Sequence, residues 1–329
     1  MIFIESPWKD AAYNLALEQY VFDEMPKNEE YFMLWQNANA IVVGKHQNTV
    51  EEINIPFVKE HGIQVVRRLS GGGAVYHDLG NINFTFIADA GDIEQINLQA
   101  FCRPVVSLLK RLGVFASITG RNDITVDGRK FSGNSQYIKQ GRIMHHGTLL
   151  FDSDLSVVGD ALKVSKDKIA SKGFQSVRSR VTNLKPYMSE NMTVDRFQKL
   201  LKENMLLGKK SCVHAFTETD KKRISEIKKE RYDTWEWNYG YSPEYSIQKQ
   251  RRIDGVGKIE LFLTVKNGII ESFDSRGDYF GDGAVEELKM RLKGMALKEE
   301  AVRGALLGID MMKYYSGLET ENFVELLLS

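Results

Sequence analysis

Three consecutive glycines beside two arginines are the part of this chain best suited to binding an anion. Arg67 and Arg68 follow a short apolar stretch and precede Ser70 and residues 71–73, which are all glycine. Glycine loses much backbone entropy on folding, so a run of glycines is usually kept where a ligand approaches the main chain or where φ is positive. Bare amides next to guanidinium groups suit phosphate or carboxylate oxygens. A plain connector between two core strands would also explain the glycines.

Lys130 is a second candidate, because it follows the dipeptide Asp127-Gly128. Asp-Gly is typical of a tight type I′ turn, and residues 124–126 and 130–132 on either side of it predict the strands of a hairpin. The lysine would then lie on a rigid strand just beyond the turn, where it can be aimed at a substrate. A third candidate is the basic segment 171–184, which is either a loop that folds over an anionic ligand or a plain surface connector.

The histidines allow weaker hypotheses. His145 and His146 are adjacent, and neighbours on a strand point to opposite faces, so they do not predict a shared metal. His77 precedes Asp78 and is either a general base or a turn histidine with a structural hydrogen bond. Lys45 and the residue after it lie in a polar loop, where a solvated role competes with ligand contact. Neither the G-x-x-x-x-G-K-[ST] phosphate loop nor the G-x-S-x-G elbow occurs.

Composition, cysteine content and the lack of targeting signals predict a globular cytoplasmic protein, which we expect to be a monomer. The formal net charge is zero, which argues against a nucleic-acid partner. The two cysteines, Cys102 and Cys212, form neither a disulfide framework nor a zinc pattern. No signal peptide and no run of eighteen apolar residues is visible, so no membrane association is expected.

The pattern of apolar residues predicts an α+β protein of two domains. We expect a helix over 10–25 capped by Asp10, then strands at 31–35 and 40–43 joined as a hairpin through 37–39. Further helices are predicted near 56–61, 93–112 and 193–207, with Cys102 in the core. Alternating apolar residues over 259–265 and the turn Asn267-Gly268 begin a compact C-terminal unit. The predicted domains are 1–245 and 246–329.

Five blocks of the sequence, in order, resemble the lipoate–protein ligases of bacteria: residues 67–81, 120–123, 129–133, 145–148 and 176–184. The resemblance implies a fold shared with biotin protein ligases, in which a large catalytic domain has a mixed β-sheet with flanking helices and a small α+β accessory domain follows. It also implies an ATP- and Mg²⁺-dependent reaction. Lipoic acid becomes lipoyl-AMP with release of pyrophosphate, and the lipoyl group passes to a lysine of an acceptor. Acceptors in this family are lipoyl domains of E2 subunits of 2-oxoacid dehydrogenases and the glycine-cleavage H protein.

The resemblance also suggests roles for individual residues. Lys130 matches the catalytic lysine, and Asp123 a carboxylate that could hold Mg²⁺ beside the phosphates. Arg68 matches an arginine on the nucleotide side. The other residues matched to nucleotide or lipoate binding are Ser70, Gly71, Gly72, Gly73, Ala74, Val75, Tyr76, Asn81, Asn122, His146, Gly147, Lys172, Arg178 and Arg180.

Three other functions compete with this hypothesis. An octanoyl or lipoyl transferase would need a nucleophilic thiol near the lysine, but no cysteine lies between Cys102 and Cys212. A non-catalytic lipoate-binding protein would not need the lysine, the glycines and the basic segment together. A biotin ligase would carry a different glycine-rich arginine loop.

Overall fold

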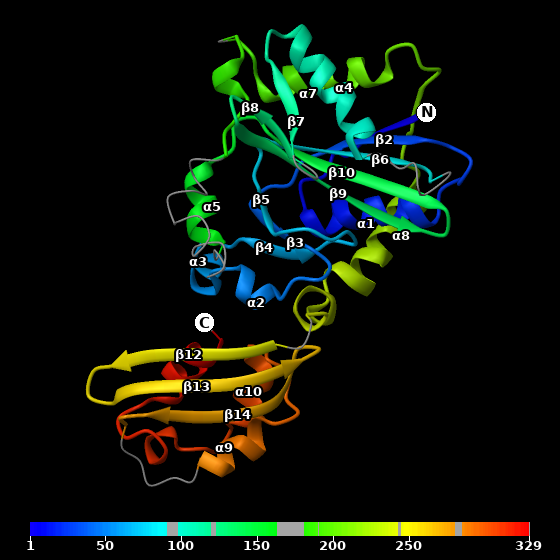
Figure 1. Ribbon diagram of the computed structural model, residues 1–329. Coiled ribbons are helices and arrows are strands. Elements are labelled where there is room, and N and C mark those ends of the chain that lie inside the picture. The colour runs from blue at the N-terminus through cyan, green and yellow to red at the C-terminus, as the bar shows by residue number, and fades with distance from the viewer. Residues whose placement is uncertain are drawn as a thin grey trace.

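The computed structural model describes residues 1–90, 98–119, 123–162, 181–189, 191–242, 245–279 and 285–328. An eight-stranded mixed sheet with helices on both faces dominates it, and a three-stranded sheet with its own helices follows (Figure 1). The large sheet has the strand order β11-β1-β2-β6-β10-β9-β8-β7. Its strands are β1 (Ile2–Glu5), β2 (Tyr31–Trp35), β6 (Asn81–Asp89), β7 (Ala116–Thr119), β8 (Asp123–Val126), β9 (Arg129–Lys139), β10 (Arg142–Leu150) and β11 (Cys212–Val213). The expected α+β class is confirmed.

Each face of the large sheet packs against its own core cluster, because side chains alternate between the two faces along each strand and helices cover both sides. On β2, Phe32 and Leu34 enter a core cluster completed by α4 (Leu98–Arg111) and α7 (Val194–Leu206). Met33 and Trp35 enter a second cluster, completed by α1 (Ala11–Asp23) and α8 (Glu218–Ile227). Figure 1 shows these helix pairs on opposite sides of the sheet. Short helical turns complete this part of the chain: η4 (Lys185–Tyr187), η5 (Lys228–Tyr232) and η6 (Glu236–Gly240).

Helix α1 forms where the sequence predicts it. The Asp10 carboxylate accepts a 2.6 Å hydrogen bond from the amide of Tyr13, as a side-chain cap should. The helix ends before Pro26, which cannot donate to a further turn. One unexpected feature is Glu18, a carboxylate on the buried side of this helix.

Another three-stranded sheet, distinct from the one that follows at the C-terminal end, packs beside the large sheet and has the strand order β4-β3-β5. Its strands are β3 (Ala40–Val43), β4 (Gln64–Arg67) and β5 (Val75–His77), and its neighbours are α2 (Thr49–Glu52), α3 (Ile55–Glu60) and α5 (Leu155–Ala161). The hairpin expected from 31–35 and 40–43 is therefore wrong. Strand β2 pairs with β1 and β6, which occupy both of its edges, so β3 pairs with β4 and β5 in the other sheet.

Two tight turns match their sequence signals. Asp127 and Gly128 have φ of +49° and +71°, and Asn267 and Gly268 have φ of +50° and +74°. Positive φ at both central residues is the mark of a type I′ turn, so the Asp-Gly and Asn-Gly predictions are confirmed.

The C-terminal part has its own core. It contains β12 (Tyr245–Ile253), β13 (Gly257–Lys266) and β14 (Ile269–Gly277), with α9 (Val285–Leu292), α10 (Glu299–Ala305), η7 (Met311–Lys313) and α11 (Thr320–Leu328). Every second residue of β13 from Ile259 to Val265 is buried, as the alternation predicts. Contact with the rest of the chain includes a 2.7 Å ion pair from Lys59 on α3 to Glu299 on α10.

Candidate functional site

A β-bulge decides which way Lys130 points. Ile124 on β8 lies opposite Ser132 on β9, but Thr125 lies opposite Lys130, so Phe131 is an extra residue on β9. In a regular strand, residues an odd number apart point to opposite faces, so Lys130 and Gly133 would do so as well. Because the bulge inserts one extra residue between them, both point to the same face. Phe131 is fully buried in the core on the opposite face. The aimed lysine expected from the turn is thus placed by the turn and the bulge together.

Lys130 is paired but open to solvent. Its Nζ lies 2.7 Å from Oδ1 of Asp123, and the two side chains are 39% and 36% exposed. The lysine carbonyl accepts a 2.8 Å hydrogen bond from the amide of Thr182, where the described chain resumes after residue 180. Lys130 is therefore fixed at its backbone while its ammonium group remains available for other acceptors.

The glycine run lies against this same face of β9. Oγ of Ser135 donates a 2.9 Å hydrogen bond to the carbonyl of Gly71. Gly72 has φ of +92°, and a Cβ built on it would lie 2.9 Å from Nη2 of Arg68. Both the conformation and the space require glycine there. Gly72 and Gly73 are exposed, which leaves this stretch of main chain open to a ligand.

Arg68 holds the glycine run from beneath. Its guanidinium donates to the carbonyls of Gly71 (2.6 Å), Gly73 (2.8 Å) and Val42 (3.1 Å), and its Nε donates to Oγ of Ser70 (3.1 Å). Burial lowers the pKa of Arg68 to about 10, so it stays charged at neutral pH. Arg68 is buried, and four of its five N–H groups donate to the protein. In this structure it shapes the loop rather than presenting a free guanidinium, and contact with a nucleotide remains a prediction.

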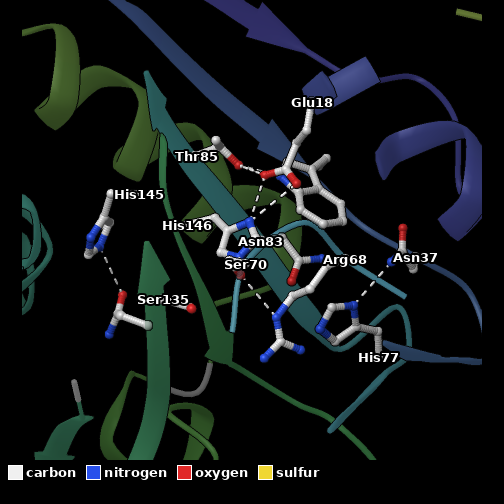
Figure 2. Close-up of polar contacts among 12 residues, drawn as sticks. Glu18, Asn37, Arg68, Ser70, His77, Asn83, Thr85, Ser135, His145 and His146 are labelled. Atoms are coloured by element: carbon white, nitrogen blue, oxygen red, sulfur yellow. Dashed lines mark hydrogen bonds and ion pairs between the residues drawn. The ribbon is translucent and has the colours of Figure 1, made fainter. Parts of the chain in front are cut away.

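Behind the loop lies a buried polar chain (Figure 2). Oγ of Ser70 is 2.6 Å from Nε2 of His146, and Nδ1 of His146 is 3.0 Å from Oε1 of Glu18. Glu18 also accepts from Oγ1 of Thr85, which in turn accepts from the Trp35 indole at 2.9 Å. His146 therefore lies behind the glycine loop, buried and bonded to Ser70 and Glu18, and its contact with a ligand remains a prediction. Sequence reasoning missed Glu18, because an isolated acidic residue among the apolar positions of a helix matches no motif.

Arg67 is the other residue whose role the sequence did not reveal. It is fully buried and donates to Gly44, Lys45 and Gln47 of the loop after β3, at 2.7–3.0 Å. It also donates to the carbonyls of Trp237 and Asn238, in η6 shortly before β12. Gly44 in turn abuts the glycine run, because a Cβ on it would meet the Gly72 carbonyl oxygen at 2.0 Å. The two adjacent arginines therefore bind different loops. Arg68 donates to the glycine loop, and Arg67 donates to the neighbouring loop 44–47.

The remaining expected residues lie in different places. Ala74 and Val75 are partly buried, and the hydroxyl of Tyr76 donates to Asn39 at 3.1 Å. Asn81 is buried and donates to Asn83. Gly147 lies on the other face of the sheet, where a Cβ would be 2.2 Å from Asn134 and 2.6 Å from Phe84. Four expected residues lie outside the described residues: Asn122, Lys172, Arg178 and Arg180.

Two other histidines have structural surroundings. Nδ1 of His77 is bonded to the amide of Asn37 at 3.1 Å, and burial lowers its pKa to about 3. His145 points to the face opposite His146, where its ring stacks on Phe101 at 4.8 Å and burial lowers its pKa to about 3 as well. Both rings are neutral at physiological pH. The adjacent pair does not share a metal, and His77 fits the structural hypothesis better than the general-base one.

Neither cysteine lies at Lys130. Cys102 lies on α4 and is buried in the core, where burial raises its pKa to about 12. Cys212 is exposed on β11, at one edge of the sheet, five strands away from β9. At about 4.8 Å per strand this separation is about 24 Å, so thiol transfer through either cysteine has no structural support.

The described residues contain no group of three or more His, Cys, Asp or Glu side chains placed to bind a metal. Beside Lys130, the partly exposed carboxylate of Asp123 offers the hard oxygen ligands that Mg²⁺ prefers. Because Mg²⁺ is usually held by one or two carboxylates together with substrate phosphates, this donor fits a metal that arrives with a nucleotide. Within the same residues, no helix has the length and apolar character needed to cross a membrane.

Lys130, Asp123 and the exposed residues Gly72 and Gly73 thus border one face of a mixed sheet, and residues of these types suit a phosphate-containing ligand. Two family models match this chain. The lipoyl protein ligase A/B catalytic domain matches residues 10–206, and the bacterial lipoate protein ligase C-terminus matches residues 242–327. The chain therefore belongs to the lipoate–protein ligase family, and it is an enzyme of that class.

Relatives and solved structures agree with the family models. The lipoate-protein ligase LplJ of Bacillus subtilis is 45% identical over 99% of this chain and all of its own length. Lipoate–protein ligase 1 of Staphylococcus aureus is 39% identical over 97% of both chains. The structure of P. falciparum LipL1 in complex with lipoate has a TM-score of 0.63 and 26% identity, over 99% of this chain and 98% of that one. A lipoate-protein ligase A bound with ATP shares the fold, with a TM-score of 0.61 and 24% identity over 73% of this chain and 98% of its own.

Proposed function

We propose that this enzyme activates lipoic acid with ATP at the face of β9 that carries Lys130 and the glycine loop, and then lipoylates an acceptor lysine. The observation that carries the proposal is the shared face itself. The bulge at Phe131 turns Lys130 toward the side on which Ser135 holds Gly71, so a cation and exposed amides border one surface. The relatives are named for the same activity, and the solved fold relatives include one with lipoate and one with ATP.

In the first step a carboxylate oxygen of lipoic acid attacks the α-phosphorus of ATP. The bond to the bridging oxygen of the β-phosphate breaks, and pyrophosphate leaves with the electron pair. Lys130 serves this step because an ammonium group has three donors, and Asp123 takes only one of them in the described structure. The other two can bridge the lipoyl oxygen and a phosphate oxygen, which offsets the repulsion between two anions.

The glycine loop supplies a fixed cradle for the nucleotide. Gly72 and Gly73 are exposed, and Arg68 and Ser135 hold the carbonyls of Gly71 and Gly73, so the main chain of the loop is fixed before the ligand arrives and its amides can serve as donors. We propose that Ala74, Val75 and Tyr76 continue this contact. Lys172, Arg178 and Arg180 would close over the intermediate and shield it from water.

We propose that Asp123 would hold Mg²⁺, which would neutralise phosphate charge as pyrophosphate leaves. Asp123 would then act as both a metal ligand and the orienting partner of Lys130. The carboxylate keeps the ammonium group aimed along the strand, and it remains accessible enough to reach a second cation.

In the second step the ε-amine of the acceptor lysine attacks the lipoyl carbonyl. The bond from the carbonyl carbon to the AMP oxygen breaks, AMP leaves, and the amine loses a proton to give an amide. Lys130 would stabilise the oxyanion that forms on the carbonyl oxygen. We propose as acceptors the lipoyl domains of E2 subunits and the glycine-cleavage H protein; one fold relative is an archaeal ligase solved in a study of its E2 lipoyl domain.

The division of labour along the chain is also proposed. Residues 1–245 would form the catalytic domain and residues 246–329 the accessory domain, in a monomer that works in the cytoplasm. The separate hydrophobic core of β12–β14 and their helices supports this division.

ATP–pyrophosphate exchange with and without lipoic acid tests the proposal. The wild type should exchange label only with lipoic acid, and Lys130→Ala should reduce the rate by about 10²–10³-fold, the typical effect of removing one transition-state donor. Lys139→Ala is the matched control, because Lys139 is an exposed, ion-paired lysine at the far end of the same strand. Lipoate-dependent exchange that survives Lys130→Ala unchanged would contradict the role given to Lys130.

A further inference from the structure

Glu18 ends a hydrogen-bonded chain that starts at the glycine loop (Figure 2). The side chain is 2% exposed and projects from α1 beneath the large sheet. No motif of the sequence contains it. A buried carboxylate is costly unless its oxygens are bonded, and both donors to Glu18, Thr85 and His146, come from the face of the sheet that holds the glycine loop.

When the His146 ring is neutral, the hydrogen bonds from Ser70 through His146 to Glu18 can run in only one direction. The Glu18 carboxylate can only accept, so Nδ1 of His146 carries the hydrogen and Nε2 must accept. The hydroxyl of Ser70 donates to that Nε2 at 2.6 Å. Its oxygen remains free to accept from Nε of Arg68, at 3.1 Å. A protonated ring would leave the Ser70 hydroxyl without an acceptor among its described partners.

Arg68 connects the chain to the loop. The same guanidinium that donates to Ser70 donates to the carbonyls of Gly71 and Gly73 on either side of Gly72. A shift of Ser70 would therefore remove one of the bonds that orient Arg68 and weaken its hold on both carbonyls. Glu18 and Arg68 are also opposite charges buried on the same side of the sheet, so each reduces the cost of burying the other.

We propose that Glu18 is a positioning residue for the glycine loop, acting through His146, Ser70 and Arg68. The proposal rests on the function proposed above, in which this loop cradles ATP. Removing the charge of Glu18 lets His146 turn, so Ser70 loses its fixed acceptor and Arg68 its fixed orientation. The amides of Gly72 and Gly73 are then no longer preorganised, and the loss appears in ATP binding more than in the chemical step.

The test is lipoate-dependent ATP–pyrophosphate exchange with Glu18→Gln, Ser70→Ala and the double variant. Ser70→Ala removes the donor to Nε2 of His146, and Glu18→Gln replaces one of the two carboxylate oxygens that face Nδ1 of His146 with an N–H donor. Each single variant should therefore raise KM for ATP about tenfold, the usual effect of disrupting a buried hydrogen bond. The double variant should be no worse than the worse single one, because both cut the same chain. Asp220→Asn is the matched control, since this carboxylate also bonds α1, through the hydroxyl of Tyr20, but lies away from the loop. It should leave KM for ATP unchanged.

Three results would overturn the proposal. The first is an unchanged KM for ATP in a folded Glu18→Gln variant, and the second is a double variant in which the two effects multiply. If Glu18→Gln does not fold, Ser70→Ala decides alone: an unchanged KM for ATP in that variant is the third. A wild-type protein with no lipoate-dependent exchange would instead overturn the proposed function and the role of Glu18 together.

Discussion

Replacing Arg67 by methionine should destabilise the protein strongly. The side chain is fully buried and donates to seven acceptors drawn from three segments: the loop 44–47, Thr49 on α2, and residues 237–242. Met fills much of the same volume but donates to none of them. The main-chain bonds of residue 67 to Asn238 and Trp237 remain in the variant, so the change isolates the guanidinium.

Two opposing effects of Arg67→Met set the size of the change in the free energy of unfolding. Each buried acceptor left without a donor costs about 1–3 kcal/mol, although several of these carbonyls can find water once the loop loosens. Methionine also removes the cost of burying a charge, a cost that lowers the pKa of Arg67 to about 10. A net loss of about 3–5 kcal/mol in the free energy of unfolding is expected, as for other broken buried charge clusters.

Urea unfolding followed by tryptophan fluorescence measures this loss. With an m value of about 3 kcal/mol/M, the midpoint should fall by about 1 M or more. Arg67→Lys keeps the charge but has only three donors, so it should lie between the wild type and Arg67→Met. Arg252→Met is the control: this arginine is 73% exposed with a single 3.3 Å ion pair, and its loss should not shift the midpoint measurably. A loss below about 1 kcal/mol for Arg67→Met would refute the view that Arg67 ties the three segments together.

Two further predictions concern the other buried titratable groups. His77 and His145 have pKa values lowered from 6.5 to about 3 by burial, so below pH 6.5 the unfolded state binds protons that the folded state does not. The free energy of unfolding should therefore fall by about 2 kcal/mol per histidine between pH 7 and pH 5. In urea titrations at a series of pH values, His145→Gln should remove about half of this pH dependence. A free energy of unfolding that does not change with pH would contradict the burial of both rings in their neutral form. Cys102 is buried with its pKa raised to about 12 while Cys212 is exposed, so a thiol reagent should label one site quickly in the native protein. The variant Cys102→Ala/Cys212→Ser should keep lipoate-dependent exchange and lipoylation, and loss of lipoylation alone would revive the thiol-transfer mechanism.

Local features of the fold could be read from the sequence because each depends on a few neighbouring residues. The cap at Asp10, the two type I′ turns and the alternation along β13 all follow from backbone preferences or side-chain period within one element. The hairpin predicted between β2 and β3 failed for the opposite reason. Strand pairing is decided by which edges are free, and β1 and β6 compete for the edges of β2 from elsewhere in the chain.

The candidate site shows the same division. The sequence by itself pointed to the glycine run, Arg68, Lys130 and Asp123, because their residue types suit anions and their motifs are contiguous. It could not show that Phe131 is an extra residue, although this bulge is what turns Lys130 to the face of the glycine loop. Nor could it show that Arg68 is used internally, since its acceptors include a carbonyl 26 residues away.

The sequence thus determined which groups are available, and the tertiary structure decided how they meet. Glu18 and His146 are 128 residues apart, and only the packing of α1 under β10 brings them to hydrogen-bonding distance. Arg67 likewise joins segments up to 175 residues away. Contacts of this kind depend on strand register and on the packing of helices against the sheet. Both are set by the burial of many apolar side chains at once, which no local pattern records.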